Sequence, residues 1–156
     1  MKKSIVLFTN SLIEQEISNN IYSLNKETMN YNLKLNKEDI EEILKTRKAA
    51  LKTTERIEFN GEIITKIIRV FCDSPYISQY NYGDTINSLV DIFYNYKNET
   101  LNYIGDEELI EIMKKYFDEY CQGSLELLEG KVLYKIADNI RSGVRNYTDI
   151  SDDKDY

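Results

Sequence analysis

The side chains that most often carry out chemistry in proteins are scarce in this sequence. Histidine is absent, and only two cysteines occur, Cys72 and Cys121. Without an imidazole there can be no Ser-His-Asp or Cys-His nucleophile, no HExxH zinc site and no Glu-x-x-His di-iron site. The two cysteines show neither a CxxC pair nor a metal-ligand spacing. We therefore predict no catalytic residue, no metal site and no cofactor, and a protein that is not an enzyme.

The stretch FCDSPYISQYNYGDT, residues 71–85, holds the only proline, one cysteine, three tyrosines and a glycine. Its simplest interpretation is a corner between two helices, because Ser74-Pro75 suits the start of a helix. The alternative is a small polar pocket beside Cys72. Its candidate binding residues are Asp73, Tyr76, Tyr80 and Tyr82. Both cysteines are expected at helix C-termini, where the helix dipole opposes a thiolate, so neither is predicted to be a nucleophile.

Arg47 is the one charged residue that falls within an apolar helical stripe. Ile40, Leu44, Arg47 and Leu51 follow one another at spacings of four, three and four. A charge in that position needs a partner or a route to water. Either its stem packs and its guanidinium reaches solvent or pairs with a carboxylate of a neighbouring helix, or Arg47 binds an anion inside a cleft.

Charge is unevenly distributed along the chain. Residues 1–70 carry 12 basic and 10 acidic side chains, a net charge of +2, whereas residues 71–156 carry 8 and 17, a net charge of −9. A surface of this kind repels nucleic acid and anionic lipid, so we predict neither nucleic-acid nor membrane binding. A basic stripe is expected on one side of the second helix, as a solvated face or a docking site for the acidic half of another copy. Its residues are Lys45, Lys48, Lys52 and Arg56.

Helical periodicity dominates, and we predict helices over about 11–30, 36–51, 61–72, 79–97, 106–121 and 124–143. Ser11, Asn36, Asn60 and Ser124 are the expected N-caps, with Phe59 packing onto Ile64. Gly123 suits the end of the fifth helix, and Gly130 weakens the case for a continuous last helix. Acidic residues are concentrated in the first turns of the fifth helix, where they interact favourably with the helix dipole. Glu111 and Lys115 are spaced to form an ion pair. Ser4–Phe8 and Arg56–Phe59 are the only strand candidates. The predicted fold is an all-α compact bundle of five to six helices.

The length of 156 residues fits one domain, predicted over residues 1–143. The remaining residues, 144–156, are acidic and poor in apolar side chains, so a disordered tail is expected. The N-terminus has too short an apolar run for a secretory core or a membrane span. Two unpaired thiols favour a reducing compartment, and we predict a cytoplasmic protein.

Several segments resemble an uncharacterised family of small helical proteins from Gram-positive anaerobes. They are RIEFNGEIITKIIRVFCDSPYISQ (56–79), IFYNYKNETL (92–101), DEELIEIMKKYFD (106–118) and CQGSLELL (121–128). The resemblance spans roughly residues 10–143. It implies a shared fold and a domain of unknown function, with no activity or site residues to transfer.

Thirteen tyrosines are the main clue to function. One helix face cannot bury Tyr76, Tyr80, Tyr94, Tyr96 and Tyr103 together, and exposed tyrosines favour contact surfaces. We therefore predict a non-enzymatic module that binds another protein or itself. The alternative is a domain that binds or senses a small anionic ligand, through Arg47 and the 71–85 corner.

Overall fold

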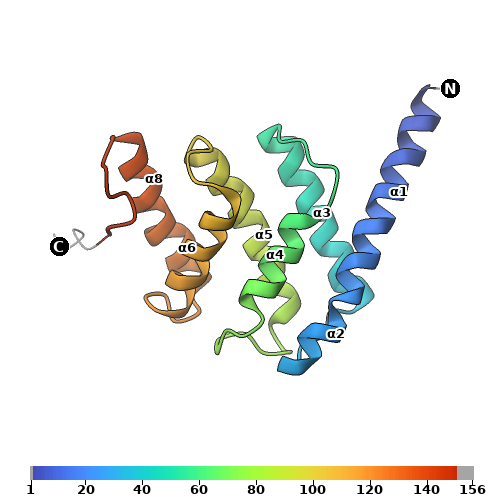
Figure 1. Cartoon of the computed structure of the whole chain (residues 1–156), viewed down its shortest axis with the longest axis horizontal. Helices are drawn as coiled ribbons and strands as arrows, with labels where there is room; N and C mark the ends of the chain where they lie inside the picture. The colour runs from blue at the N-terminus through green and yellow to red at the C-terminus, as the bar shows by residue number, and fades with distance from the viewer. Residues whose placement is uncertain (1, 151–156) are drawn as a thin grey trace.

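The computed structural model describes residues 2–150, with side chains described from residue 12 onward. Every regular element in this part of the chain is helical, which confirms the predicted all-α class (Figure 1). The elements are α1 (Lys2–Ser23), α2 (Asn25–Thr28), η1 (Met29–Tyr31), α3 (Lys37–Thr54), α4 (Glu62–Phe71), α5 (Tyr82–Glu99), α6 (Asp106–Asp118), α7 (Leu125–Leu127), η2 (Leu128–Leu133) and α8 (Tyr134–Arg141). Within the described residues, no helix combines the length and apolar character needed to cross a bilayer.

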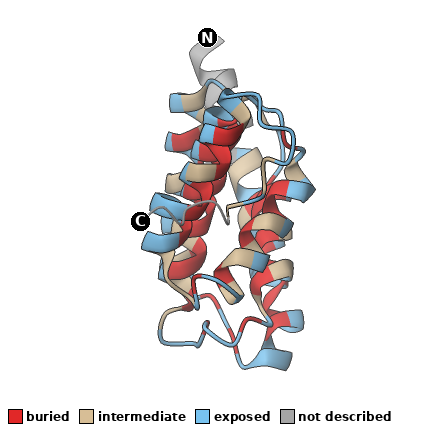
Figure 2. Ribbon diagram, turned by 90° about the vertical axis from the view of Figure 1, so that its left-hand side faces the viewer, coloured by how far each residue is buried: buried red, intermediate tan, exposed pale blue. Residues whose placement is uncertain are grey.

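The helices form two layers, and they succeed one another from α1 at one end of the molecule to α8 at the other (Figures 1 and 2). One layer holds α1, α3, α5 and α8, and the other holds α4 and α6. The most extensive helix contact joins α3 to α5, while α4 packs on α6. Buried residues face the space between the layers (Figure 2). The core therefore extends along the whole molecule.

The start of α3 and the buried face of α4 agree with the predictions, whereas the N-cap of α4 is Gly61 and not Asn60 as predicted. Asn36 caps α3 through a reciprocal capping box, in which Asp39 N donates to Asn36 Oδ1 (2.7 Å) and Asn36 N donates to Asp39 Oδ2 (3.1 Å). The apolar stripe of α4 is fully buried, as predicted: Ile63, Ile64, Ile67, Ile68 and Phe71. The prediction that Phe59 packs onto Ile64 of this helix is wrong, because Phe59 is 76% exposed.

The first helix begins earlier than predicted. Ser11 lies inside α1, which starts at Lys2, so its role as an N-cap and a strand over Ser4–Phe8 are both wrong. Residues 2–10 contain neither proline nor glycine, and nothing in them stops the helix. The helix predicted to reach residue 30 ends at Ser23, and α2 and η1 follow it. Asn32 is the C-cap of η1, with φ 60°. The strand predicted over Arg56–Phe59 is also wrong, because these residues connect α3 and α4 without regular structure.

The last helix changes pitch and does not break at Gly130. Ser124 caps it as predicted, since its Oγ accepts from Leu127 N (3.2 Å). Elements α7, η2 and α8 then follow without an intervening loop, and η2, which contains Gly130, is a π-helical segment. A π-turn accommodates one extra residue without ending the helix.

Residues after the last helix fold back onto it. Asn139 Nδ2 donates to the carbonyl oxygens of Tyr147 (3.0 Å) and Asp149 (3.2 Å), and Tyr116 Oη donates to Thr148 O (2.7 Å). Tyr147 Oη donates to a carboxylate oxygen of Glu108 on α6 (3.0 Å). Packing therefore continues past residue 143, and residues 151–156 of the predicted tail lie outside the described residues.

Candidate functional site

The structure does not gather the candidate residues of the 71–85 stretch into one site. Residues 72–81 connect α4 to α5, which is the predicted corner. Asp73 forms an ion pair with Lys114 (2.8 Å), and Tyr76 packs edge-on against a core phenylalanine. Tyr80 is 98% exposed, whereas Tyr82 is 1% exposed. Two of these tyrosines therefore lie in opposite environments, in solvent and in the core.

The thiols and the Tyr82 hydroxyl are poor acids in this fold. Burial raises the pKa of Cys121 to about 11. Burial, with the nearby Asp73 carboxylate, also raises the pKa of Cys72. Burial raises the pKa of Tyr82 to about 12, against the opposing effect of the Thr28 hydroxyl. All three groups are therefore protonated at neutral pH, and the cysteines are not activated as nucleophiles.

Arg47 is buried and held by the loop that follows its own helix. Its side chain is 7% exposed, Nη2 donates to Asn60 O (2.8 Å), and Glu58 Oε1 lies 3.6 Å away. Glu58 also accepts from Arg56 Nε and from Tyr94 Oη, both at 2.7 Å. Arg47 therefore has a carboxylate partner, but it comes from the loop after α3 and not from a neighbouring helix as predicted, and it also accepts hydrogen bonds from Arg56 and Tyr94.

The same network continues to α5 and α6 through Arg56. The Arg56 guanidinium donates to both oxygens of Asp106 (2.9 and 3.3 Å), and Lys97 Nζ lies 3.1 Å from Asp106 Oδ1. Burial alone would raise the pKa of Asp106, but the hydrogen bonds from Arg56 and Lys97 outweigh it and hold the pKa below its ordinary value. Lys97 also donates to Ile104 O (2.6 Å). Arg56 thus lies outside α3, and the four-residue basic stripe predicted on that helix is wrong.

Three cations and two carboxylates make up this network, which leaves one positive charge in excess. The cations are Arg47, Arg56 and Lys97, and the carboxylates are Glu58 and Asp106. Arg56 and Lys97 lie at the C-terminal ends of α3 and α5, where each helix contributes about half a negative charge. These two helix ends offset part of the excess, and the N-terminal end of α6 at Asp106 opposes them. We interpret the network as a structural clamp. Arg47 Nη2 is engaged inside it, while Arg47 Nε is buried and has no hydrogen-bond partner among the described residues.

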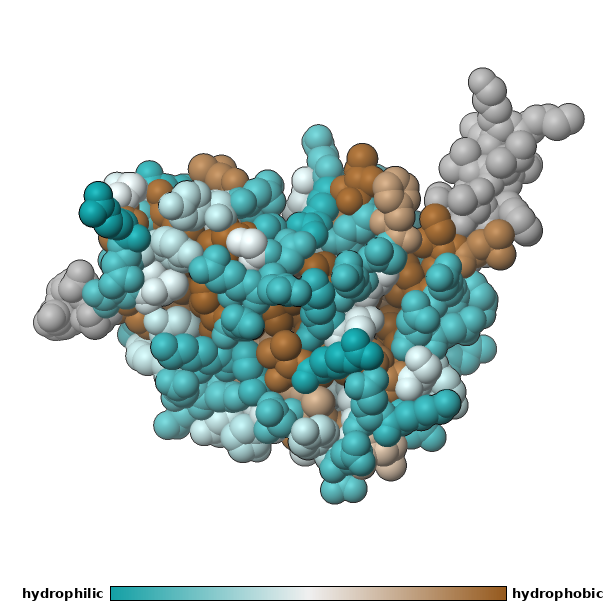
Figure 3. Space-filling model, viewed as in Figure 1, coloured by the Kyte–Doolittle hydropathy of each residue, from teal (hydrophilic) through white to brown (hydrophobic). Residues whose placement is uncertain are grey.

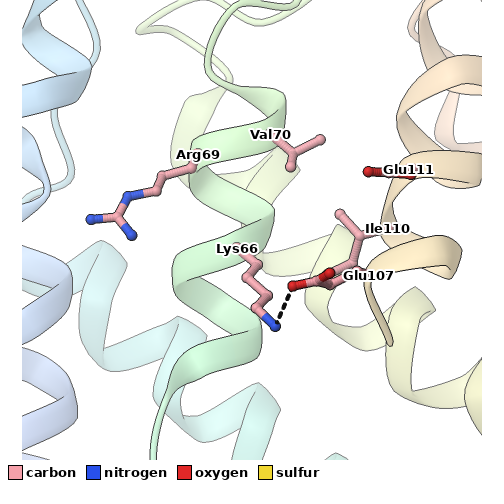
Figure 4. Close-up of a pocket in the computed structure, with 6 residues that line it drawn as sticks. All are labelled: Lys66, Arg69, Val70, Glu107, Ile110 and Glu111. Carbon is pink, nitrogen blue, oxygen red and sulfur yellow. Dashed lines mark ion pairs between the residues drawn. The ribbon is translucent and has the colours of Figure 1, made fainter. Parts of the chain in front are cut away.

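A groove of about 320 Å³ lies between α4 and α6 (Figure 4). Val70 and Ile110 give it an apolar lining, and Lys66 closes one end through an ion pair with Glu107 (3.1 Å). Arg69 points away from α6, toward its partner Glu27 (Figure 4). Apolar surface shows between hydrophilic side chains along this face (Figure 3). The charges along the groove are mostly paired within the protein, so they offer little to a ligand.

A second groove, of about 420 Å³, lies between the α5–α6 loop and the end of α8. Its lining is mostly apolar: Leu101, Tyr103, Ile140, Gly143, Val144 and Arg145. Leu101 is 71% exposed, Tyr103 67% and Val144 44%. The Tyr103 ring is held edge-on against the Tyr147 ring (centroids 5.6 Å apart). We call this site the 101–145 groove.

Leu101 projects into solvent from an unfavourable backbone position. Asn102 N donates to Lys97 O (2.8 Å) and Leu101 N to Asn98 O (3.0 Å), which is the Schellman arrangement at the end of α5. Leu101 occupies its left-handed position, with φ 57°, where glycine is usual. Gly143 fills the same position after α8, with φ 75°. An exposed leucine in a left-handed conformation contributes neither burial nor relaxed geometry to the fold, and strain of this kind collects at functional sites.

Sequence reasoning missed this groove because its residues come from segments 40 positions apart. Tyr103 was the one groove residue singled out, as a tyrosine that one face could not bury. Leu101 gave no usable signal, because the helix was predicted to end at about residue 97, whereas α5 ends at Glu99 and only then is Leu101 in the position where glycine or asparagine is expected. The clamp residues Glu58 and Lys97 carried no signal either.

These features define a two-layer all-helical protein with shallow surface grooves and a partly buried ionic clamp. The family whose description reads "Family of unknown function (DUF6323)" matches residues 20–146, and the chain belongs to this family. The match confirms the expected membership of a family of unknown function. No curated protein and no solved structure matches the chain.

Proposed function

We propose that the protein is a non-enzymatic, cytoplasmic interaction module that binds a segment of another protein in the 101–145 groove. The observation that carries the proposal is the exposure of Leu101 in a left-handed conformation, beside the exposed rings and aliphatic groups of Tyr103 and Val144. A rigid tyrosine ring that lines a groove is a typical anchor for a protein partner. Aliphatic side chains beside it add apolar area that a partner can bury. Scattered apolar residues elsewhere on the surface need no such explanation.

The ordered backbone around the groove favours this proposal. The Schellman bonds fix Leu101, the ring contact with Tyr147 orients Tyr103, and the Val144 N–H donates to Asn139 O (2.8 Å). A partner that docks here meets a preorganised surface, so little entropy is lost on binding. The alternative, a small anionic ligand at Arg47, has less support, because Arg47 Nη2 already contacts the carbonyl oxygen of Asn60 and a carboxylate oxygen of Glu58, which leaves Nε as its one buried nitrogen without a partner among the described residues.

Site-specific photo-crosslinking in cells tests the proposal. The photoreactive amino acid p-benzoylphenylalanine replaces Tyr103, which lines the groove, or Tyr134, which is 58% exposed on α8 and does not line it. We expect a discrete crosslinked species above the monomer mass at position 103 and none, or a different one, at position 134. No crosslink at position 103, with the folded protein present at normal levels, would reject the groove as a protein-binding site.

A further inference from the structure

The charge that lines the 101–145 groove points to the chemistry of its occupant. Arg145 lines the groove and is exposed, and no ion pair or hydrogen bond of its side chain is found among the described residues. The other arginine at this end, Arg141, lies beside Glu99, with a carboxylate oxygen at 3.7 Å and the carbonyl oxygen at 3.3 Å. The groove therefore presents an uncompensated guanidinium next to apolar side chains.

This cation is unusual for its part of the chain. Residues 71–156 carry a net charge of −9, yet the charged residue that lines this groove is basic. Guanidinium binds carboxylates through paired hydrogen bonds, and five N–H donors are available for that purpose. An acidic group on a bound segment would find its partner here, while the acidic surface beyond the groove would repel segments with several acidic residues.

The apolar lining of the groove indicates that its occupant also carries a large apolar side chain. Leu101, Ile140 and Val144 offer aliphatic contacts, and Tyr103 offers a ring held in place by Tyr147. A leucine, isoleucine or phenylalanine on the occupant would displace water from these surfaces, which stabilises the complex by about 25 cal/mol for each Å² of apolar area buried. A purely charged segment would leave them exposed to water.

We infer that the occupant of the 101–145 groove is a peptide segment of another protein that carries a large apolar side chain next to a single carboxylate, which binds Arg145. The inference rests on the proposed function and adds the class of partner. A second copy of this chain is the main competing occupant. The two are distinguished by the oligomeric state of the free protein.

The probe is a phage-displayed library of random 12-residue peptides, selected on the immobilised full-length protein. We expect enrichment of peptides that pair Leu, Ile or Phe with one Asp or Glu. Leu101→Asn should weaken the selected peptides at least tenfold in fluorescence anisotropy. Asparagine tolerates the left-handed conformation, so the Tm of this variant should stay the same or rise, and loss of binding cannot be attributed to unfolding.

Arg145→Glu provides the charge test. A selection on this variant should favour Lys or Arg in place of the acidic residue, with the apolar residue retained. Enriched peptides that bind wild type, Leu101→Asn and Arg145→Glu equally, or an absence of enrichment, would overturn the inference. A wild-type dimer that Leu101→Asn dissociates in analytical ultracentrifugation would also overturn it, in favour of a second copy. If crosslinking at position 103 captures a protein while peptide selection shows no acidic preference, the proposed function stands and the partner class is wrong.

Discussion

At the scale of single residues, Glu58 organises the partly buried ionic network. Its side chain is 9% exposed and accepts hydrogen bonds from Arg56 and Tyr94, with Arg47 3.6 Å away. Burial, with the neighbouring Glu58 carboxylate, raises the pKa of the Tyr94 hydroxyl, which acts as a donor. Removing one member of a buried charge pair is costly because the remaining charges stay out of water.

Glu58→Gln should lower the free energy of unfolding by about 2–4 kcal/mol, because Arg47 and Arg56 would then face a neutral amide. The matched control is Glu42→Gln. Glu42 is 66% exposed and lies 4.0 Å from Lys45, so its loss should change stability by less than about 0.5 kcal/mol. Urea unfolding followed by circular dichroism measures both values. Equal effects of the two substitutions would contradict the role of Glu58 as a buried hub.

At the scale of elements, helix ends determine where the chain turns. Asn32, Glu55, Leu101 and Gly143 adopt left-handed conformations at the ends of η1, α3, α5 and α8, and Gly123 does so after α6 with φ 86°. Asparagine and glycine are the residues that suit this conformation. Gly123 has a second constraint, because a Cβ atom there would lie 2.6 Å from Tyr76 Cβ.

Gly123→Ala should destabilise the protein by about 1–3 kcal/mol, through both the left-handed φ and the contact with Tyr76. Gly105→Ala is the control, since Gly105 has φ −63° and no atom lies within 4 Å of its added Cβ. We expect this second change to cost less, about 0.5 kcal/mol, because Gly105 is the N-cap of α6, where alanine is less favourable than glycine. Thermal unfolding of both variants gives the comparison, and a Tm for Gly123→Ala at or above that of Gly105→Ala would refute the account of this turn.

At the scale of the whole molecule, Asp106 joins three parts of the chain. Its carboxylate lies at the start of α6 and binds Arg56, after α3, and Lys97, in the last turn of α5. The lowered pKa of Asp106 is therefore linked to packing between the layers. A carboxyl group whose pKa is lower in the folded than in the unfolded protein stabilises the fold above its unfolded pKa, and that stabilisation is lost as pH falls through the folded pKa.

The free energy of unfolding should fall as pH decreases below about 4, where Asp106 becomes protonated. Asp106→Asn should be less stable than wild type at pH 7 by about 1–3 kcal/mol and should lose less stability between pH 4 and pH 2. Glu27, whose pKa the Arg69 hydrogen bond lowers, contributes in the same range and remains in both proteins. Urea titrations at several pH values provide the test. Parallel pH profiles for the two proteins would mean that Asp106 does not contribute.

The sequence by itself determined what depends on local pattern. Helical periodicity placed the stripe of α4, the Asn36 and Ser124 caps encoded their helix starts, and low helix-breaker content explains why α1 extends back to Lys2. Tertiary structure alone decided which distant groups meet. Glu58 meets Tyr94, Arg56 meets Asp106, and Leu101 lies beside Val144 only because the C-terminal ends of α3, α5 and α8 and the start of α6 lie on the same side of the molecule (Figure 1). Such pairings depend on how helices pack in space, and no local periodicity records them.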